Sequence, residues 1–160
     1  MSQRIVLQSV IAAGAIVFFA FYKFSGCFDR STNSGLPTTK MQIGNKPFEL
    51  EIANTPDARQ TGLMRRDSMP ADHGMIFIFR ESREWSFYMK NTRIPLDIVF
   101  VDANGRIVSI RQMKPYALTS IGPPAAVKYA IELNEGAAAN AGAKVGDQLS
   151  IPDAARDAKE

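Results

Sequence analysis

The sequence predicts a mainly β domain: a compact antiparallel barrel or sandwich of about eight short strands with one or two short helices. Two observations support this class. Short apolar runs recur along the chain, and in several of them polar residues alternate with apolar ones. Gly, Pro, Asn and Asp separate these runs at close intervals, which is typical of hairpins and tight turns. An N-terminal hydrophobic segment precedes the domain.

The first part of the domain predicts a hairpin followed by a helix. Residues 41–43 and 48–52 are apolar runs on either side of Gly44-Asn45-Lys46, and the second run alternates with glutamates. Thr55-Pro56-Asp57 then has the residues of a helix start: an N-cap hydroxyl, a proline at the first helical position and an acid near the positive end of the dipole. Gly62 is placed to end this short helix.

The remaining strands follow from alternation and from turn residues. Residues 75–79 (MIFIF) are apolar throughout, which suits a strand buried on both faces, whereas residues 85–90 (WSFYMK) alternate. An Asn-Gly pair at 104–105 predicts a hairpin between strands at 96–101 and 106–113. Residues 127–133 alternate again, residues 137–141 predict one helical turn, and residues 149–151 predict a last short strand.

The N-terminus has the composition of an export signal or anchor. Residues 5–22 are almost entirely apolar and lie between Arg4 and Lys23. We therefore divide the chain into a signal peptide or membrane anchor (1–24), a flexible tether (25–39), one β-rich domain (40–152) and a charged tail (153–160). The division predicts that residues 1–24 attach the protein to the bacterial inner membrane, with the domain on the periplasmic or extracytoplasmic side.

Cys27 offers a second way of attaching the chain to the membrane, through lipidation. Phe24-Ser25-Gly26-Cys27 resembles the bacterial lipoprotein box, in which small residues precede a lipidated cysteine. The hydrophobic segment is therefore retained as an anchor, cleaved, or replaced by lipid on Cys27. We favour the uncleaved anchor, and Cys27 is the lipidation candidate.

The composition excludes several classes of protein. Cys27 and His73 are the single cysteine and the single histidine, so no disulfide can form within the chain and no Cys/His zinc site can be assembled. After Arg4 and Lys23, the other 17 basic residues are interspersed with 16 acidic ones, unlike the concentrated basic surface of a nucleic-acid-binding protein. No nucleotide-binding or nucleophile motif is present, and we expect no cofactor.

Four phrases of the sequence indicate a family. These are ANTPDARQTGLMRR, HGMIFIF, WSFYMKNTRIPLDIVFVDANGRIVSI and YAIELNEGAAANAGAKVGDQL, which together extend over about residues 40–151. In this combination the chain resembles the prokaryotic family known as domain of unknown function 192, with Tyr88 in place of a tryptophan. The resemblance implies a compact β-rich barrel and frequent export. It supplies no catalytic residue, because the family has no established activity.

One group of polar residues is a candidate site. Lys90, Asn91 and Thr92 lie at a predicted turn, and Asp97 lies in the next strand on the same side as Val99 and Val101. A carboxylate in apolar company needs partners, which Lys90 or backbone amides of the turn could supply. The group is either a ligand-binding or catalytic site, joined by His73 as an acid or base, or a structural clamp at the turn.

Three functions remain open from the sequence. The first is a non-enzymatic accessory domain that binds a protein, a peptide or another envelope ligand at the membrane. The second is an enzyme of unassigned reaction that uses Lys90, Asp97 and His73. The third is a metal carrier, because methionine thioethers are soft ligands that select Cu(I), although methionine also fills irregular cores. The methionines in question are Met64, Met69, Met75, Met89 and Met113.

Overall fold

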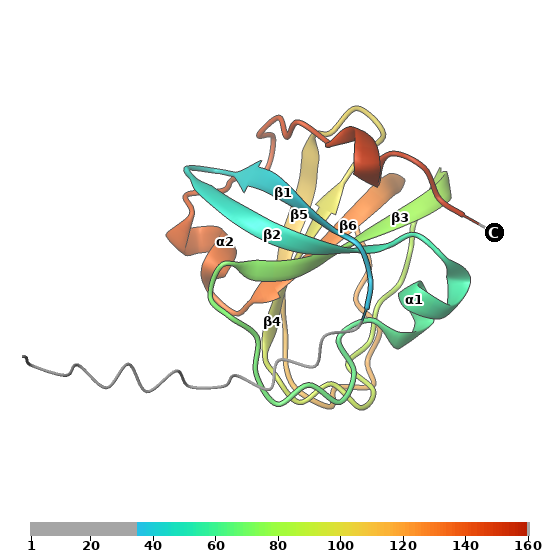
Figure 1. Cartoon of the computed structure of the whole chain (residues 1–160), viewed down its shortest axis with the longest axis vertical. Helices are drawn as coiled ribbons and strands as arrows, with labels where there is room; N and C mark the ends of the chain where they lie inside the picture. Colours follow the sequence, from blue (N-terminus) through green and yellow to red (C-terminus); the bar gives the residue numbers. More distant parts are fainter. Residues whose placement is uncertain (1–34, 160) are drawn as a thin grey trace, which may run out of the picture.

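The computed structural model describes residues 35–159, so the predicted anchor, Cys27 and most of the predicted tether lie outside the described residues. Six strands, two helices and one 3₁₀ turn make up this part of the chain (Figure 1). The strands are β1 (Thr38–Ile43), β2 (Lys46–Ala53), β3 (His73–Arg83), β4 (Leu96–Val101), β5 (Ile107–Met113) and β6 (Val127–Asn134). The helices are α1 (Pro56–Thr61) and α2 (Ala137–Asn140), and the 3₁₀ turn η1 spans Asp153–Ala155. Within residues 35–159, no helix has the length and apolar character to cross a membrane.

The strands form one mixed sheet in the order β1-β2-β3-β6-β4-β5. The prediction of a mainly β domain with two short helices is therefore confirmed, but the sheet is not closed and has six strands instead of about eight. It is also not fully antiparallel, because β2 and β3 run parallel. Residues 54–72 connect them, including α1, and a parallel pair requires such a long crossover to return the chain to the same end of the sheet.

Two predicted strands are absent from the sheet. Residues 85–90 make a single bridge, between Phe87 and Ile121, and residues 149–151 make none. The aromatic side chains of the first segment pack instead against the sheet: the ring of Phe87 lies edge-on to Phe77, with the ring centroids 5.2 Å apart. The alternation of residues 85–90 thus reflects burial of one side of a loop.

The predicted turns and caps are confirmed. Thr55 accepts a hydrogen bond from the Ala58 amide at 3.2 Å, Pro56 starts α1, and Gly62 ends it with a positive φ of 50°. In the β4–β5 hairpin, the Asp102 carboxylate accepts hydrogen bonds from the amides of Asn104 and Arg106, both at 2.8 Å. These contacts are local, so the residue types alone favour them.

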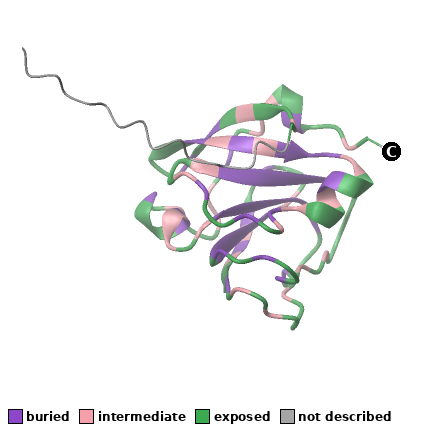
Figure 2. Ribbon diagram, turned by 60° about the horizontal axis from the view of Figure 1, so that its bottom comes forward, coloured by how far each residue is buried: buried purple, intermediate pink, exposed green. Residues whose placement is uncertain are grey.

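The core has one cluster of buried side chains on each side of the sheet. Met41 of β1 and Ile107 of β5 both belong to the first cluster, although they come from opposite edges of the sheet. The second cluster, around Phe77 and Phe100, is covered by α1 and by the loops that follow it and β3. Figure 2 shows the buried residues concentrated along the strands and the exposed ones on the helices and loops. Because β3, β6 and β4 lie between the two clusters, their side chains are buried on both faces over most of their length.

Candidate functional site

Three long loops meet at one end of the sheet, below the strands in Figure 1. They span residues 62–72, 84–95 and 114–126. Backbone hydrogen bonds join them: the Arg65 amide donates to the Asn91 carbonyl at 2.8 Å, and the Tyr116 amide donates to the Thr92 carbonyl at 3.1 Å. Arg65, Asn91 and Tyr116 are also the non-glycine residues of the described chain with positive φ, at 64°, 58° and 60°. Strained backbone of this kind clusters at functional sites, which directs attention to this end of the sheet.

A cavity of about 120 Å³ opens between α1, β3 and the second of these loops. We call it the aromatic pocket. Its lining consists of residues 59–64, Phe77, Phe79, residues 85–88, Thr92 and Glu132. Aromatic side chains therefore form much of the lining, and Thr92 and Glu132 are its buried polar residues.

The aromatic wall is built as a stack. Phe79 and Trp85 lie nearly parallel, with their centroids 4.0 Å apart. The guanidinium of Arg59 lies 5.8 Å from the Phe79 centroid, and that of Arg83 lies 3.7 Å from the Trp85 centroid. Each pair gains cation–π attraction. The arginines thus hold the rings in place and occupy ring faces that would otherwise be available to a ligand.

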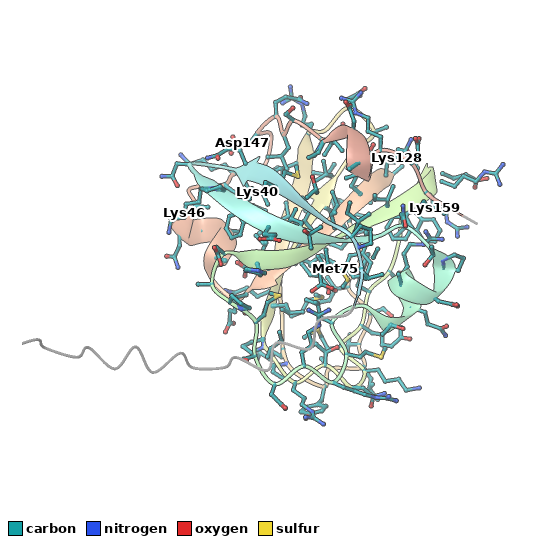
Figure 3. The ribbon with its side chains drawn as sticks, in the orientation of Figure 1. Lys40, Lys46, Met75, Lys128, Asp147 and Lys159 are labelled. Carbon is teal, nitrogen blue, oxygen red and sulfur yellow. The ribbon has the colours of Figure 1, made fainter. Side chains whose placement is uncertain are left out.

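Behind the pocket, acidic side chains from two strands point to the same side of the sheet. In the sheet register, Glu51 of β2 lies opposite Met75 of β3, and Met75 lies opposite Glu132 of β6; Met75 is labelled in Figure 3. Arg66, from the loop after α1, binds Glu51 through two hydrogen bonds, and the Nη2–Oε2 distance is 2.8 Å. The Arg66 and Glu51 side chains are only 7% and 14% exposed, so this ion pair is largely buried.

Glu132 differs from Glu51 because it is buried without a hydrogen-bond donor in the described residues. It is 6% exposed, and no group within residues 35–159 donates a hydrogen bond to its carboxyl. Burial raises its pKa to about 8, against the opposing effect of the Arg66 charge. Because the carboxyl also lines the cavity, the aromatic pocket presents a carboxylic acid that is mostly protonated at neutral pH.

The structure does not bring the five predicted polar residues together. Thr92 is buried and lines the aromatic pocket, whereas Lys90 and Asn91 are exposed on the adjacent turn. His73 is half-exposed at the start of β3, where its Nδ1 lies 2.9 Å from Asp72 Oδ1. Its Nε2 lies 3.9 Å from Glu49 Oε2.

Asp97 is buried at 3% exposure and accepts a hydrogen bond from the backbone amide of Ala138 in α2, at 3.0 Å. Lys90 makes no ion pair with it in the described part of the chain. The partner of Asp97 therefore comes from a helix 41 residues away, in place of the adjacent turn that we expected.

The described residues show no group of three or more His, Cys, Asp or Glu side chains that could hold a metal ion. The predicted methionine ligands are dispersed in the core: Met69, Met75, Met89 and Met113 all belong to the second core cluster. Met64 lines the aromatic pocket.

A larger cavity, of about 450 Å³, lies between the start of β2 and α2. Its polar lining is satisfied within the protein: Asn134 donates hydrogen bonds to the carbonyls of Met69 and Pro70, at 3.1 and 2.9 Å. Its charged lining residues, Lys46, Asp72 and Glu135, are exposed. This cavity therefore lacks the buried, unpartnered polar group that distinguishes the aromatic pocket.

Sequence reasoning missed Glu51, Arg66 and Glu132. Residues 127–133 alternate, and such alternation by itself indicates a strand with one wet face, on the side of Glu132. The strand instead lies between β3 and β4, with both faces covered. One signal was available: the neighbouring runs at 75–79 and 96–101 are apolar, apart from Asp97, which is typical of a sheet covered on both sides.

Asp97 gives a prediction about stability. We expect Asp97→Ala to lower the free energy of unfolding by about 1–3 kcal/mol, because it leaves the buried Ala138 amide without an acceptor. Asp97→Asn retains an oxygen at the same place and should cost less. Urea unfolding of both variants tests this order. Equal stability of both variants and the wild type would show that the hydrogen bond to α2 does not stabilise the domain.

Glu132 gives a prediction about pH. Its pKa is raised from 4.5 to about 8 in the folded protein, so its contribution to stability is present below about pH 4.5 and is lost as the pH rises toward 8. Over that interval, the wild type should lose stability relative to Glu132→Gln by at most about 1.4 kcal/mol per pH unit. The measurement is chemical unfolding at several pH values, with exposed Glu81→Gln as the control. Parallel curves for wild type and Glu132→Gln would contradict it.

Comparisons with known proteins place the chain in a family. Residues 38–151 match the model of DUF192, an uncharacterized ACR family. No curated protein matches the chain. A crystal structure from Sinorhizobium meliloti 1021, provisionally described as a transcription regulator, is 35% identical, with a TM-score of 0.65, and covers 69% of this chain and 89% of its own. The crystal structure of a protein of unknown function from Novosphingobium aromaticivorans DSM 12444 is 31% identical, with a TM-score of 0.68. The match covers 74% of this chain and 89% of that protein. With a family model matched over most of its length and these similar folds, the chain belongs to the DUF192 family.

Proposed function

We propose that this domain is a binding module whose aromatic pocket holds one side chain of a protein or peptide partner. The observation that carries the proposal is the Glu132 carboxyl, which is buried, faces the cavity and receives no hydrogen bond from residues 35–159. Buried polar groups are nearly always hydrogen-bonded. Because Glu132 lines the open pocket and receives no hydrogen bond from the described residues, a bound group can supply its partner.

The size of the cavity favours a single side chain over a whole small molecule. Pockets for drug-sized ligands measure roughly 300–1,000 Å³, whereas the aromatic pocket measures about 120 Å³. A pocket of this size resembles the site of an anchor residue at a protein interface, where one inserted side chain contributes much of the binding energy.

The surface around the pocket is suited to such an interface. Tyr88, Tyr116 and Leu118 are 45%, 60% and 73% exposed, although their side chains are large and apolar. They lie on loops that are joined by the hydrogen bond from the Met89 amide to the Ala117 carbonyl, at 2.8 Å. Tyrosine is enriched at protein interfaces, so these residues form a contact surface at the loop end of the sheet.

The alternative of an enzyme centred on Lys90 and Asp97 gains less support from the geometry. Asp97 is bound to α2 and Lys90 is exposed on another loop, so these groups do not converge on a cavity. Catalysis by acid and base groups requires such convergence.

We also propose that the module works at a membrane, attached through residues 1–24. The support is the apolar run of residues 5–22 between Arg4 and Lys23. After fractionation of cells that express the full-length chain, we expect the protein in the membrane pellet. Recovery of unprocessed chain in the cytosolic fraction would contradict this attachment.

A peptide screen tests the binding function. The full-length chain in lipid nanodiscs is screened against peptides displayed on phage, and we expect enriched peptides to share one residue type at one position. Ser86 is exposed and lines the pocket, so Ser86→Trp should obstruct it and weaken binding of an enriched peptide at least about tenfold by calorimetry.

Ser82→Trp is the matched control, since Ser82 is exposed on β3 and lies outside the pocket lining. It should leave the affinity unchanged. Absence of enrichment over empty nanodiscs, or equal binding by both variants, would show that the aromatic pocket is not the binding site.

A further inference from the structure

Resting on the proposed function, we propose that the aromatic pocket selects a neutral amide, which in a peptide is the side chain of Asn or Gln. Glu132 donates a hydrogen bond to the amide carbonyl and accepts one from the amide NH₂ group. The existing partners of the nearby arginines, the occupied ring faces and the hydrogen-bonding capacity of a protonated carboxyl all support this class of ligand.

The basic side chains near Glu132 are already bound to other groups of the protein. Arg66 is paired with Glu51 through two hydrogen bonds, so the pair behind the pocket carries no net charge. Arg59, on α1, donates from Nη1 to the carbonyls of Asn54 and Ile78, at 2.7 and 3.1 Å. The charge of Arg59 attracts a carboxylate ligand, but its Nη1 is already bound to these two carbonyls. A carboxylate also offers no hydrogen-bond donor to the carbonyl oxygen of the Glu132 carboxyl.

A cationic ligand is disfavoured because the ring faces that would bind it are occupied. Aromatic pockets bind ammonium groups through exposed ring faces. Here Phe79 and Trp85 stack on each other, while Arg59 and Arg83 lie over the same two rings. The faces of these rings are therefore occupied, and the positive charge of Arg59 at the lining repels a second cation.

A neutral amide fits the groups that remain. A protonated carboxyl offers one O–H donor and one carbonyl acceptor, and a primary amide offers the complementary acceptor and donor. The two groups can form paired hydrogen bonds without transferring a proton. Buried carboxylic acids that stay protonated near neutral pH are known to serve as hydrogen-bond donors. A cavity of about 150 Å³ holds a benzene ring, so one of about 120 Å³ has room for an amide on a short apolar stem.

Three probes of nearly equal shape and of the size of a Gln side chain test the choice of ligand: propionamide, propionate and propylammonium. Each is titrated into the full-length chain at about pH 6.5, and its dissociation constant is measured by ligand-observed NMR. We expect propionamide to bind at least about fivefold more tightly than either charged probe, and Ser86→Trp to abolish the difference. Tighter binding of propionate or propylammonium, or no binding of propionamide, would overturn the amide assignment. The peptide screen decides the binding function independently of this result.

The pH dependence separates a role of Glu132 in binding from a purely structural one. At about pH 9.5 Glu132 loses the proton that it donates, so propionamide should bind the wild type at least about fivefold more weakly than at pH 6.5. Glu132→Gln retains an amide that can pair with propionamide but does not titrate, so its affinity should be equal at both pH values.

The other charged and titratable groups beside Glu132 are Arg66 from the loop after α1, Glu51 from β2, Arg59 from α1 and Tyr88 from the loop after β3. The arginines stay charged over this range, and Tyr88→Phe controls for the tyrosine. The same pH response in Glu132→Gln as in the wild type would overturn the role assigned to Glu132.

Discussion

The buried ion pair between Arg66 and Glu51 is the interaction on which the loop end of the structure depends. Arg66 belongs to the connection that makes β2 and β3 parallel, and Glu51 belongs to β2, so the pair ties this connection to the sheet. The connection in turn places Leu63 and Met69 over the second core cluster. Removing one partner of a buried pair typically costs about 3–5 kcal/mol, because the other charge stays buried. The charge of Arg66 also lowers the pKa of Glu132, although burial outweighs this effect and the pKa stays raised.

The central strands show why polar residues in this sheet are informative. β3, β6 and β4 lie between two core clusters, so a polar side chain on them must find a partner inside the protein. Asp97 finds one in the amide of Ala138, and this contact holds α2 against the first cluster. Glu132 has none within residues 35–159 apart from the charge of Arg66. The two carboxyls are similarly buried, and Glu132 lines the aromatic pocket.

Binding and stability make opposite demands on Glu132. A buried carboxyl without a hydrogen-bond donor lowers the stability of the folded chain as the pH rises, and an apolar residue there would avoid the cost. Functional sites often carry such a cost, because the group must stay available to a ligand. The loops around the pocket also carry an energetic cost, since Arg65, Asn91 and Tyr116 adopt positive φ within them. Local strain and an unpartnered acid therefore occur at the same end of the sheet.

The sequence by itself determined the features that depend on neighbouring residues. The N-cap at Thr55, the turn at Asn104-Gly105, the mainly β class and the family all follow from residue types over short distances. Tertiary structure decided whatever depends on distant partners. It made β2 and β3 parallel, turned the alternating run of residues 85–90 into a pocket wall, and supplied Asp97 with a partner 41 residues away. It also buried both faces of β6, and thereby placed Glu132 in the lining of the aromatic pocket. Periodicity records only the relative burial of the two sides of a strand, and the position of that strand within the sheet decides whether the second side meets water.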